Sequence, residues 1–355
     1  MNHLKLSIAK LVKIEGLTII GVFIALMILF IMTAPHVFTG YRIYMSFLQT
    51  VPPLLILALG LTLVITAGEM DLSFSAIIAF SGFVFCYIFR TFGTPWLAFI
   101  LALSSGALVG LINGWMVAKV GIPSIMATLA AQFFWNGLTI LLSGGLSWNI
   151  KEIRPYFIHT LFVGRIGGLV PAQSLWGIAV AVFLWFILNR HTFGEHILFI
   201  GDNEEVAKVM GVNVITTKIK LFIFMGVISA FAGVLLTLEM INFWTTQGAG
   251  LLLPTIAAVF IGGTSIAGGY GTVIGSFFGA YIVGSLEAGV VASGIGGYWT
   301  RLVTGLVMAA SVSLNIILNK EKGERLKEKL KESIFIKKGG EKSSLLKREN
   351  LKNTY

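Results

Sequence analysis

Charged residues are scarce in this 355-residue sequence: 12% are charged and 56% are hydrophobic. Ordinary soluble domains have roughly 25% charged and 45–50% apolar residues. This imbalance excludes a water-soluble globular protein. Cysteine is almost absent as well, since Cys86 is the single one. A disulfide framework within the chain is therefore excluded, and we expect Cys86 to be an inert hydrophobic side chain.

The sequence also lacks the residue patterns of enzymes and nucleotide-binding proteins. Its five histidines form no H-E-x-x-H motif, and His191 and His196 have no partners of metal-binding type nearby. A G-x-x-x-x-G-K-[ST] motif is missing, and the glycine-rich run 262–271 has no lysine to reach a phosphate. We therefore expect no catalytic residues, no metal, no cofactor and no ATP hydrolysis by this chain.

The net charge of +10 comes largely from one segment. Residues 320–355 hold twelve Lys or Arg against six Glu. A basic cluster after a final hydrophobic run is typical of a cytoplasmic segment near anionic lipid headgroups. We expect a lipid surface and no nucleic acid as its partner.

Hydrophobic runs of about 20 residues, enough to cross a hydrocarbon core of about 30 Å, recur along the chain. They predict an all-α integral membrane protein with about ten transmembrane helices, and nine or eleven remain open. The first run is long for a signal peptide and lacks an A-x-A cleavage pattern, so it counts as a retained helix. The predicted spans are 17–34, 46–66, 72–90, 96–118, 123–143, 172–188, 218–238, 251–263, 271–290 and 298–318.

The distribution of Lys and Arg predicts the orientation, because positive residues near span ends stay in the cytoplasm. Lysines precede the first span and the basic tail follows the last. Both termini should thus be cytoplasmic, which requires an even number of spans. We expect a cytoplasmic N-terminus (1–16), a transmembrane domain (17–318) and a cytoplasmic tail (319–355). The long loop 189–217 would be cytoplasmic, and 144–171 would be external.

These two loops divide the spans into two groups of five, and an odd number per group inverts the second half. Inverted five-helix halves are a recurrent transporter plan. Glycines recur every four residues at 106, 110 and 114 in the fourth span and at 271, 275 and 279 in the ninth. Such ridges allow helices to approach closely in lipid. Because the chain has 41 glycines, coincidence remains an alternative to internal symmetry.

Several polar side chains lie within or beside the apolar spans, among them Glu69, Asp71, Ser73, Gln132, Asn136 and Thr255. They would line a polar translocation path if the chain is a permease, as the resemblance described below implies. Polar contacts between helices are the alternative interpretation. Glu239, Glu287 and Arg301 also lie at span edges, where solvation is available, and the last two could pair with each other. The glycine run, with Gly262, Gly263, Gly268 and Gly269, predicts a tight re-entrant turn or hinge buried within protein.

The cytoplasmic loop contains a short predicted helix that begins after Asp202 and Asn203 and ends at Gly211. An Asp/Asn cap, acids in the first turn (Glu204 and Glu205) and a terminal glycine are typical of an exposed helix. It could transmit force from a soluble partner or simply be a solvated connector.

Residues 205–211 (EVAKVMG) resemble the E-A-A-x-x-x-G coupling signature of ATP-binding-cassette (ABC) importer permeases. Val206 replaces the first alanine of the signature, Ala207 matches the second, and the I-x-L-P continuation is missing. Three segments together are similar to the ribose/galactose/xylose permeases: 67–73 (AGEMDLS), 201–204 (GDNE) with 211–213 (GVN), and 258–265 (AVFIGGTS) with 268–269 (GG). Their order and spacing match over residues 45–318.

The resemblance implies a permease of the bacterial cytoplasmic membrane that moves a ribose-like sugar or related polar solute. Its implied partners are a second permease copy or sister subunit, two cytoplasmic ATPase subunits and an extracytoplasmic sugar-binding protein. It assigns coupling to Asn203, Glu204, Glu205, Ala207 and Gly211. Glu69 departs from the neutral residue expected there, and the tail is longer than such permeases need. An ion-coupled secondary transporter or a channel is the alternative.

Overall fold

The computed structural model describes residues 16–292 and the single positions 294, 299, 302, 305, 306 and 309. All but the last belong to one compact unit, Met1–Met308. Most of the predicted tenth span, the basic tail, nearly all of the N-terminal segment, Arg301 and the side chain of Glu287 lie outside the described residues.

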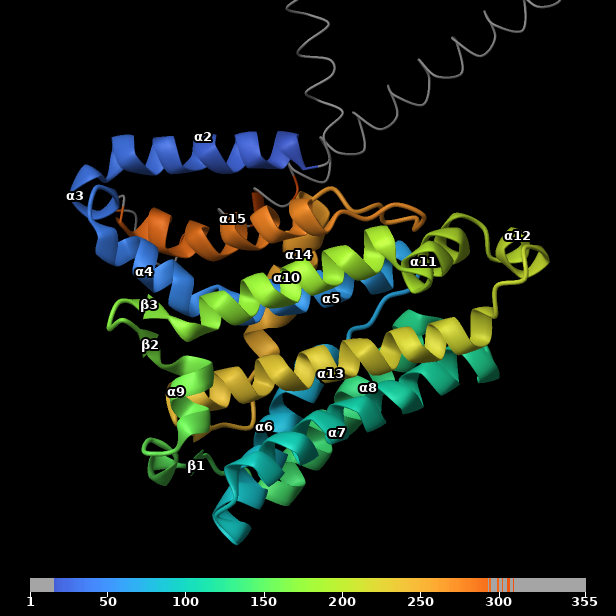
Figure 1. Cartoon of the computed structure of the whole chain (residues 1–355), viewed down its shortest axis with the longest axis horizontal. Helices are drawn as coiled ribbons and strands as arrows, with labels where there is room; N and C mark the ends of the chain where they lie inside the picture. The colour runs from blue at the N-terminus through green and yellow to red at the C-terminus, as the bar shows by residue number, and fades with distance from the viewer. Residues whose placement is uncertain are drawn as a thin grey trace, which may run out of the picture. The chain divides into compact units, whose positions relative to one another are not determined.

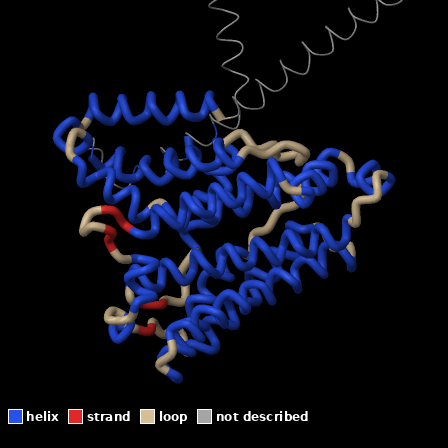
Figure 2. The backbone as a smooth tube through the Cα atoms, in the orientation of Figure 1, coloured by secondary structure: helices blue, strands red, loops and turns tan. Residues whose placement is uncertain are grey.

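The described part of the chain is a bundle of helices with two very short antiparallel strand pairs (Figures 1 and 2). Its first half contains α2 (Leu17–Thr33), α3 (Pro35–Phe38), α4 (Tyr41–Thr50), α5 (Pro52–Thr66), α6 (Phe74–Phe92), α7 (Pro95–Trp115), the π-helical turn η1 (Met116–Val120) and α8 (Ser124–Ser143). Its second half contains α10 (Ala172–Arg190), α11 (Thr192–Asp202), α12 (Glu204–Val209), α13 (Val214–Met240), η3 (Ala249–Leu251), α14 (Leu252–Ile261) and α15 (Val273–Ala292).

The segment 144–171 between the halves is folded rather than extended. It contains β1 (Trp148–Asn149), the 3-10 turn η2 (Lys151–Ile153), α9 (Phe157–Val163), β2 (Arg165–Ile166) and β3 (Val170–Pro171). Strand β1 pairs antiparallel with β4 (Asn242–Phe243), just after α13, and β2 pairs with β3. The pairing of β1 with β4 attaches this segment to the end of α13.

Each of the first nine predicted spans corresponds to a helix or a helix pair in the described part. Within residues 16–292, six helices are long and apolar enough to cross a membrane: α6, α7 with η1, α8, α10, α13 and α15. The second span is the pair α4 and α5, bent by 49°. Pro52 and Pro53 open α5, and prolines lack the N–H groups that would continue the helix from α4. A helical membrane protein is thus confirmed, with six to seven long spans and the shorter apolar helices α2 and α14.

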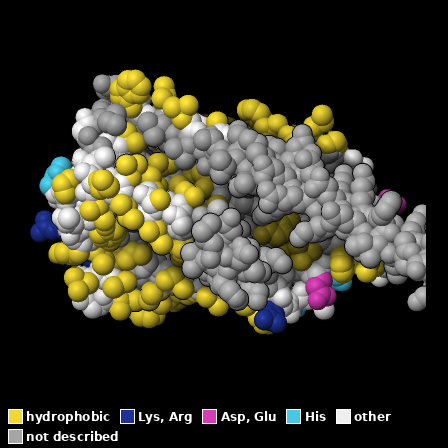
Figure 3. Space-filling view, turned by 90° about the horizontal axis from the view of Figure 1, so that it is seen from above, with side chains coloured by type: hydrophobic (Ala, Val, Ile, Leu, Met, Phe, Trp, Pro, Cys, Tyr) yellow, Lys and Arg dark blue, Asp and Glu magenta, His cyan; other side chains and the backbone are white. Residues whose placement is uncertain are grey.

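Helix α5 is at the centre of the bundle. All fifteen of its residues are buried, and it packs on α10, α13, α14 and α15. A helix that is apolar all round is suited to such a position. By contrast, α8 exposes Phe133, Phe134 and Leu141 by 62–76%, and hydrophobic side chains cover much of the described surface in Figure 3. This surface is suited to lipid.

The glycine ridges bring pairs of helices into backbone contact. A Cβ at Gly106 or Gly110 of α7 would overlap a carbonyl oxygen of α13, at Gly226 or Phe222. A Cβ at Gly275 or Gly279 of α15 would likewise overlap a carbonyl oxygen of the α14 segment. The ridges therefore have the same packing role in both halves, as expected for small residues in lipid.

Candidate functional site

Three loops meet at one end of the bundle, and they carry the three sequence segments of the family resemblance. The end of α5 lies against both α11 and the glycine run. The Gly269 N–H donates to the Thr66 carbonyl oxygen at 2.9 Å, and a Cβ at Gly201 would overlap that same oxygen. Segments 67–73, 201–204 and 262–269 are thus neighbours in space.

A chain of ion pairs connects this meeting point to α12 and α13. Lys218, near the start of α13, contacts Glu69 and Glu204 at 2.7 Å each. Lys208 contacts Glu204 at 3.1 Å and Glu205 at 2.9 Å. The side chains of Lys218 and Glu69 are only 11% and 12% exposed. Glu69 therefore lies where the three loops meet, and its ion-pair partner is Lys218 near the start of α13.

The electrostatics of Glu204 follow from these pairs. The hydrogen bond from Lys218 lowers the pKa of the Glu204 carboxyl below its ordinary 4.5, burial opposes this, and Lys208 contributes a further lowering. Glu204 is thus ionised at neutral pH. Because Glu204 contacts both lysines, it connects the first turn of α12 to α13 by charge.

Helix α12 has the predicted capping pattern. The Asn203 side-chain oxygen accepts hydrogen bonds from the N–H groups of Glu205 and Val206, at 3.0 and 3.1 Å. Ala207 is fully buried in a small cluster with Ile200, Val212 and Val214. Gly211 has φ 87°, a conformation that glycine adopts at little cost.

The outer face of α12 carries apolar side chains beside the exposed, charged Glu205 and Lys208. Val206, Val209 and Met210 are 53%, 89% and 60% exposed. Segment 204–210, anchored by Ala207 and by ion pairs, therefore exposes three hydrophobic side chains. Its helix α12 lies at one end of the bundle (Figure 1). Such an arrangement is typical of a protein-binding surface.

The glycine run forms the tight turn between α14 and α15. Gly263, Gly268 and Gly269 have φ values of 90°, 82° and 73°, and a Cβ at Gly262 would come within 2.5 Å of the Ser276 nitrogen. Positive φ and close backbone approach both require glycine here. Gly262 is buried and Gly201 lies against Gly269, whereas Ile266 and Tyr270 of the same run are 56% and 52% exposed. The prediction of a hinge therefore stays a prediction.

Asp71 and Ser73 form a buried polar group at the start of α6. Asp71 Oδ1 accepts hydrogen bonds from the Ser73 N–H and hydroxyl at 2.8 and 2.7 Å, and Asn113 of α7 donates to that hydroxyl at 2.7 Å. Burial raises the pKa of Asp71 to about 6 against the opposing effect of these bonds. Asp71 is fully buried and binds the first turn of α6.

The other candidate path residues are spread over the bundle. Gln132 of α8 is half-buried and donates to the Ser75 hydroxyl at 3.2 Å, and Asn136 is half-buried one turn further along. Thr255 is fully buried in α14, and its hydroxyl has no hydrogen-bond partner within the described part. The structure therefore groups Glu69, Asp71 and Ser73 in one segment and places Thr255 on a different helix.

Sequence reasoning missed Lys218 and Asn113 as members of this region. Lys218 was an ordinary cytoplasmic cation in the sequence, although a lysine at the very start of an apolar helix is a signal for a buried partner. Asn113 was one polar residue within a glycine ridge. Across residues 16–292, no group of three His, Cys, Asp or Glu side chains could hold a metal ion.

Comparison with known proteins decides the family. Residues 43–312 match the family model described as "Branched-chain amino acid transport system / permease component". The chain belongs to this permease family. It is therefore a component of a transport system and not itself an enzyme, and the resemblance found in the three motif segments is confirmed.

Several curated relatives are permeases of named importers. The chain is 32% identical to the inner membrane ABC transporter permease protein YjfF of Escherichia coli, over 83% of this chain and 89% of the relative. It is 31% identical to the E. coli ribose import permease protein RbsC, over 79% and 87%. It is 33% identical to the fructose import permease protein FrcC of Rhizobium meliloti, over 76% of each chain.

Proposed function

We propose that this chain is the membrane-spanning permease subunit of a bacterial ABC importer, and that it translocates a monosaccharide or a related small polar solute across the cytoplasmic membrane. The ribose and fructose permeases among its relatives support a sugar substrate. The observation that carries the proposal is the capped helix α12, which exposes apolar side chains and is tied to α13 through Glu204 and Lys218.

Helix α12 would be the coupling helix, with Asn203, Glu204, Glu205, Ala207 and Gly211 as its working residues. Its exposed face, Val206, Val209 and Met210, would dock into a cleft of a cytoplasmic ATPase subunit. Movement of α12 would reach α13 through the Glu204–Lys218 pair, and it would reach the loop after α5 through Lys218 and Glu69. This gives Glu69 a mechanical role beside its proposed place at the inner end of the path.

The proposed topology has about ten spans in two inverted halves, with both termini and the 189–217 loop in the cytoplasm. Pairwise packing supports the inversion: α6, α7 and α13 pack on one another, as do their repeat mates α14, α15 and α5. The correspondence is limited to these central helices, because α10 packs on α5 and α15 whereas its mate α2 packs on α15.

Asp71, Ser73, Gln132, Asn136 and Thr255 remain proposed path residues. Such a permease needs only a gated polar path, because an extracytoplasmic sugar-binding protein has already selected the ligand. The further partners would be a second permease, identical or related, two ATPase subunits and membrane lipid. Gly262, Gly263, Gly268 and Gly269 would form the hinge between α14 and α15.

Reconstitution tests the energy source. A shift of an alternating-access equilibrium from 1:99 to 99:1 needs about 5.5 kcal/mol of differential binding, which ATP-driven closure of the partner subunits would supply. The chain alone in liposomes should neither hydrolyse ATP nor accumulate labelled ribose or fructose. Uptake should appear when the ATPase and the binding protein are added. Accumulation by the chain alone under a proton or sodium gradient would instead support an ion-coupled transporter.

The variant Gly211→Trp tests coupling. A tryptophan at φ 87° is strained by about 1 kcal/mol or more and would alter the end of α12. No atom lies within 4 Å of a Cβ there, so membrane insertion should be normal. Stimulation of ATP hydrolysis by sugar-loaded binding protein should be lost, and normal stimulation would contradict the role of α12.

A further inference from the structure

A second polar cluster lies at the end of the bundle opposite α12. Glu239 is the penultimate residue of α13, whose 27 residues span about 40 Å. It accepts hydrogen bonds from two amide side chains: Gln49 of α4, and Gln173 of α10 at 2.5 Å. Arg165 of β2 donates to the Gln49 oxygen at 3.0 Å. Helices from both halves of the chain therefore meet at one carboxylate.

The cluster has unused hydrogen-bonding capacity. An ionised carboxylate offers about four acceptor positions, and each amide carries two donors and one acceptor oxygen. Gln173 is only 1% exposed, and its side-chain oxygen has no hydrogen-bond partner among the described residues. A buried acceptor without a donor costs about 1–3 kcal/mol, so this oxygen marks a place where a hydroxyl or N–H would be stabilised.

Glu239 has no salt bridge with a lysine or arginine among those found in the described residues. Burial lowers the pKa of the neighbouring His159, against the raising effect of Glu239 itself, so His159 is neutral near pH 7. The two groups that donate directly to the carboxylate are thus neutral amides, and Arg165 reaches it only through Gln49. The guanidinium groups of Arg42 and Arg165, which line a pocket beside Gln49, disfavour a cation there. The nearby carboxylate disfavours an anion, so the mixed site suits a neutral hydrogen-bonding ligand.

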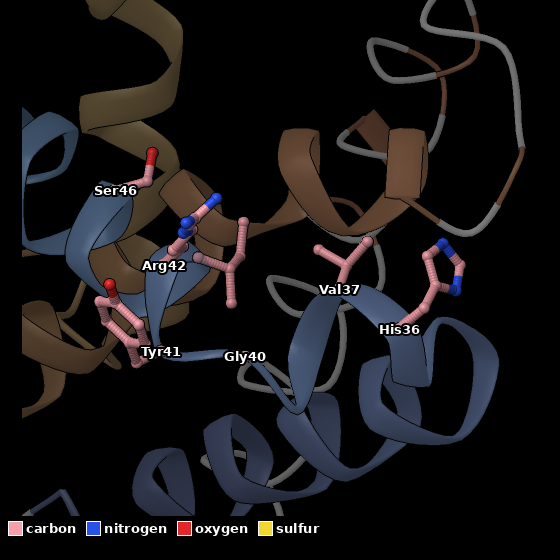
Figure 4. A pocket seen from close by; sticks show the side chains of 7 residues that line it. His36, Val37, Gly40, Tyr41, Arg42 and Ser46 are labelled. Atoms are coloured by element: carbon pink, nitrogen blue, oxygen red, sulfur yellow. The ribbon is translucent and has the colours of Figure 1, made fainter.

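The cluster borders a cavity. A pocket of about 390 Å³ is lined by Gln49 and Arg165 together with Tyr41, Arg42 and Ser46, within the roughly 300–1,000 Å³ range of ligand sites. The adjoining pocket, about 440 Å³, shares Tyr41, Arg42 and Ser46. In Figure 4, Arg42 and Ser46 extend from α4 and His36 from α3. A small solute in the 390 Å³ pocket would therefore contact the cluster at Gln49, which in turn donates to Glu239. Glu239 and Gln173 do not line the pocket themselves.

We propose that Glu239, Gln49 and Gln173 form a sugar-binding subsite at the outer entrance of the translocation path. A pair of neighbouring sugar hydroxyls would donate to the Glu239 carboxylate and the Gln173 oxygen, and would accept from the free amide N–H groups. The inference rests on the proposed sugar import, and it adds three residues that the sequence did not indicate as path residues.

The test measures uptake by the full complex in proteoliposomes with its ATPase and binding protein. Labelled D-ribose and D-fructose, each with its monodeoxy analogues, are compared for the wild type and Glu239→Gln. Because the same binding protein serves both samples, its own discrimination cancels in the ratio. A hydrogen bond to a charged group predicts that one deoxy analogue is taken up roughly tenfold less well by the wild type and that the variant loses this preference.

Gln173→Leu is a second variant of similar shape, and it should weaken the same preference. Glu152→Gln makes the same chemical change at an exposed carboxylate of the 144–171 segment, and should leave the preference unchanged. An unchanged preference in both cluster variants, or an equal fall in uptake of all analogues together with ATP hydrolysis, overturns the subsite. Absence of any sugar uptake by an ATP-hydrolysing wild-type complex would overturn the proposed function along with it.

Discussion

Removing Lys218 tests whether the ion pairs hold the coupling loop to the bundle. Lys218→Met would leave Glu69, a carboxylate whose side chain is 12% exposed, without its partner at 2.7 Å. Breaking a buried pair from one side costs about 3–5 kcal/mol. Even the lower value corresponds to a roughly hundredfold increase in local opening. Amide hydrogen exchange in residues 67–71 and 204–211 should therefore accelerate by roughly a hundredfold.

Two further variants separate charge from shape. Glu69→Gln leaves Lys218 paired with Glu204 at 2.7 Å, so it should cost about 1 kcal/mol, an exchange increase of roughly fivefold. Adding Glu69→Gln to Lys218→Met removes the unpaired charge and should restore much of the protection.

Lys220→Met is the matched control, because it replaces a lysine by methionine on the exposed side of α13, two residues from Lys218. If exchange in Lys218→Met rises no more than in Lys220→Met, the ion pairs do not hold the loop and the reasoning is wrong.

Two other predictions concern helix packing and pH. Gly110→Leu should prevent the close contact of α7 with α13, because even a Cβ at Gly110 would overlap the Phe222 carbonyl oxygen. We expect this variant to abolish stable protein in the membrane. Gly137→Leu on α8 should be tolerated, because a Cβ there has no atom within 4 Å. Equal membrane levels and equal heat inactivation of the two variants would contradict this. The hydrogen bond from Lys218 lowers the pKa of Glu204 below 4.5 in the folded protein. The stabilisation of α12 by the ionised Glu204 should therefore be complete above pH 4.5, and it should be lost as the pH falls through the folded-state pKa of Glu204. Amide hydrogen exchange of residues 204–211, corrected for the pH dependence of the intrinsic exchange rate, should show this loss of stabilisation in the wild type. The pH dependence should be weaker in Glu204→Gln.

Composition and hydrophobic periodicity were enough to predict a helical membrane protein. The predicted spans 123–143 and 172–188 differ little from α8 (Ser124–Ser143) and α10 (Ala172–Arg190), because the backbone in lipid must satisfy its hydrogen bonds within a helix. Local capping chemistry likewise predicted α12 from Asn203 and Gly211. The three motif segments were enough to indicate the permease family, since they could be recognised without knowing how they fold together.

The tertiary structure alone decided which polar residues share a site. Glu69 and Lys218 are far apart in sequence, and their pairing depends on how the end of α5 packs beside the start of α13. The same holds for Glu239, Gln49 and Gln173, which come from α13, α4 and α10. Hydrophobic periodicity reports which residues face lipid or protein, but it carries no information on which helices are neighbours. That is decided by side-chain fit and by the glycines that bring α7 onto α13 and α15 onto α14.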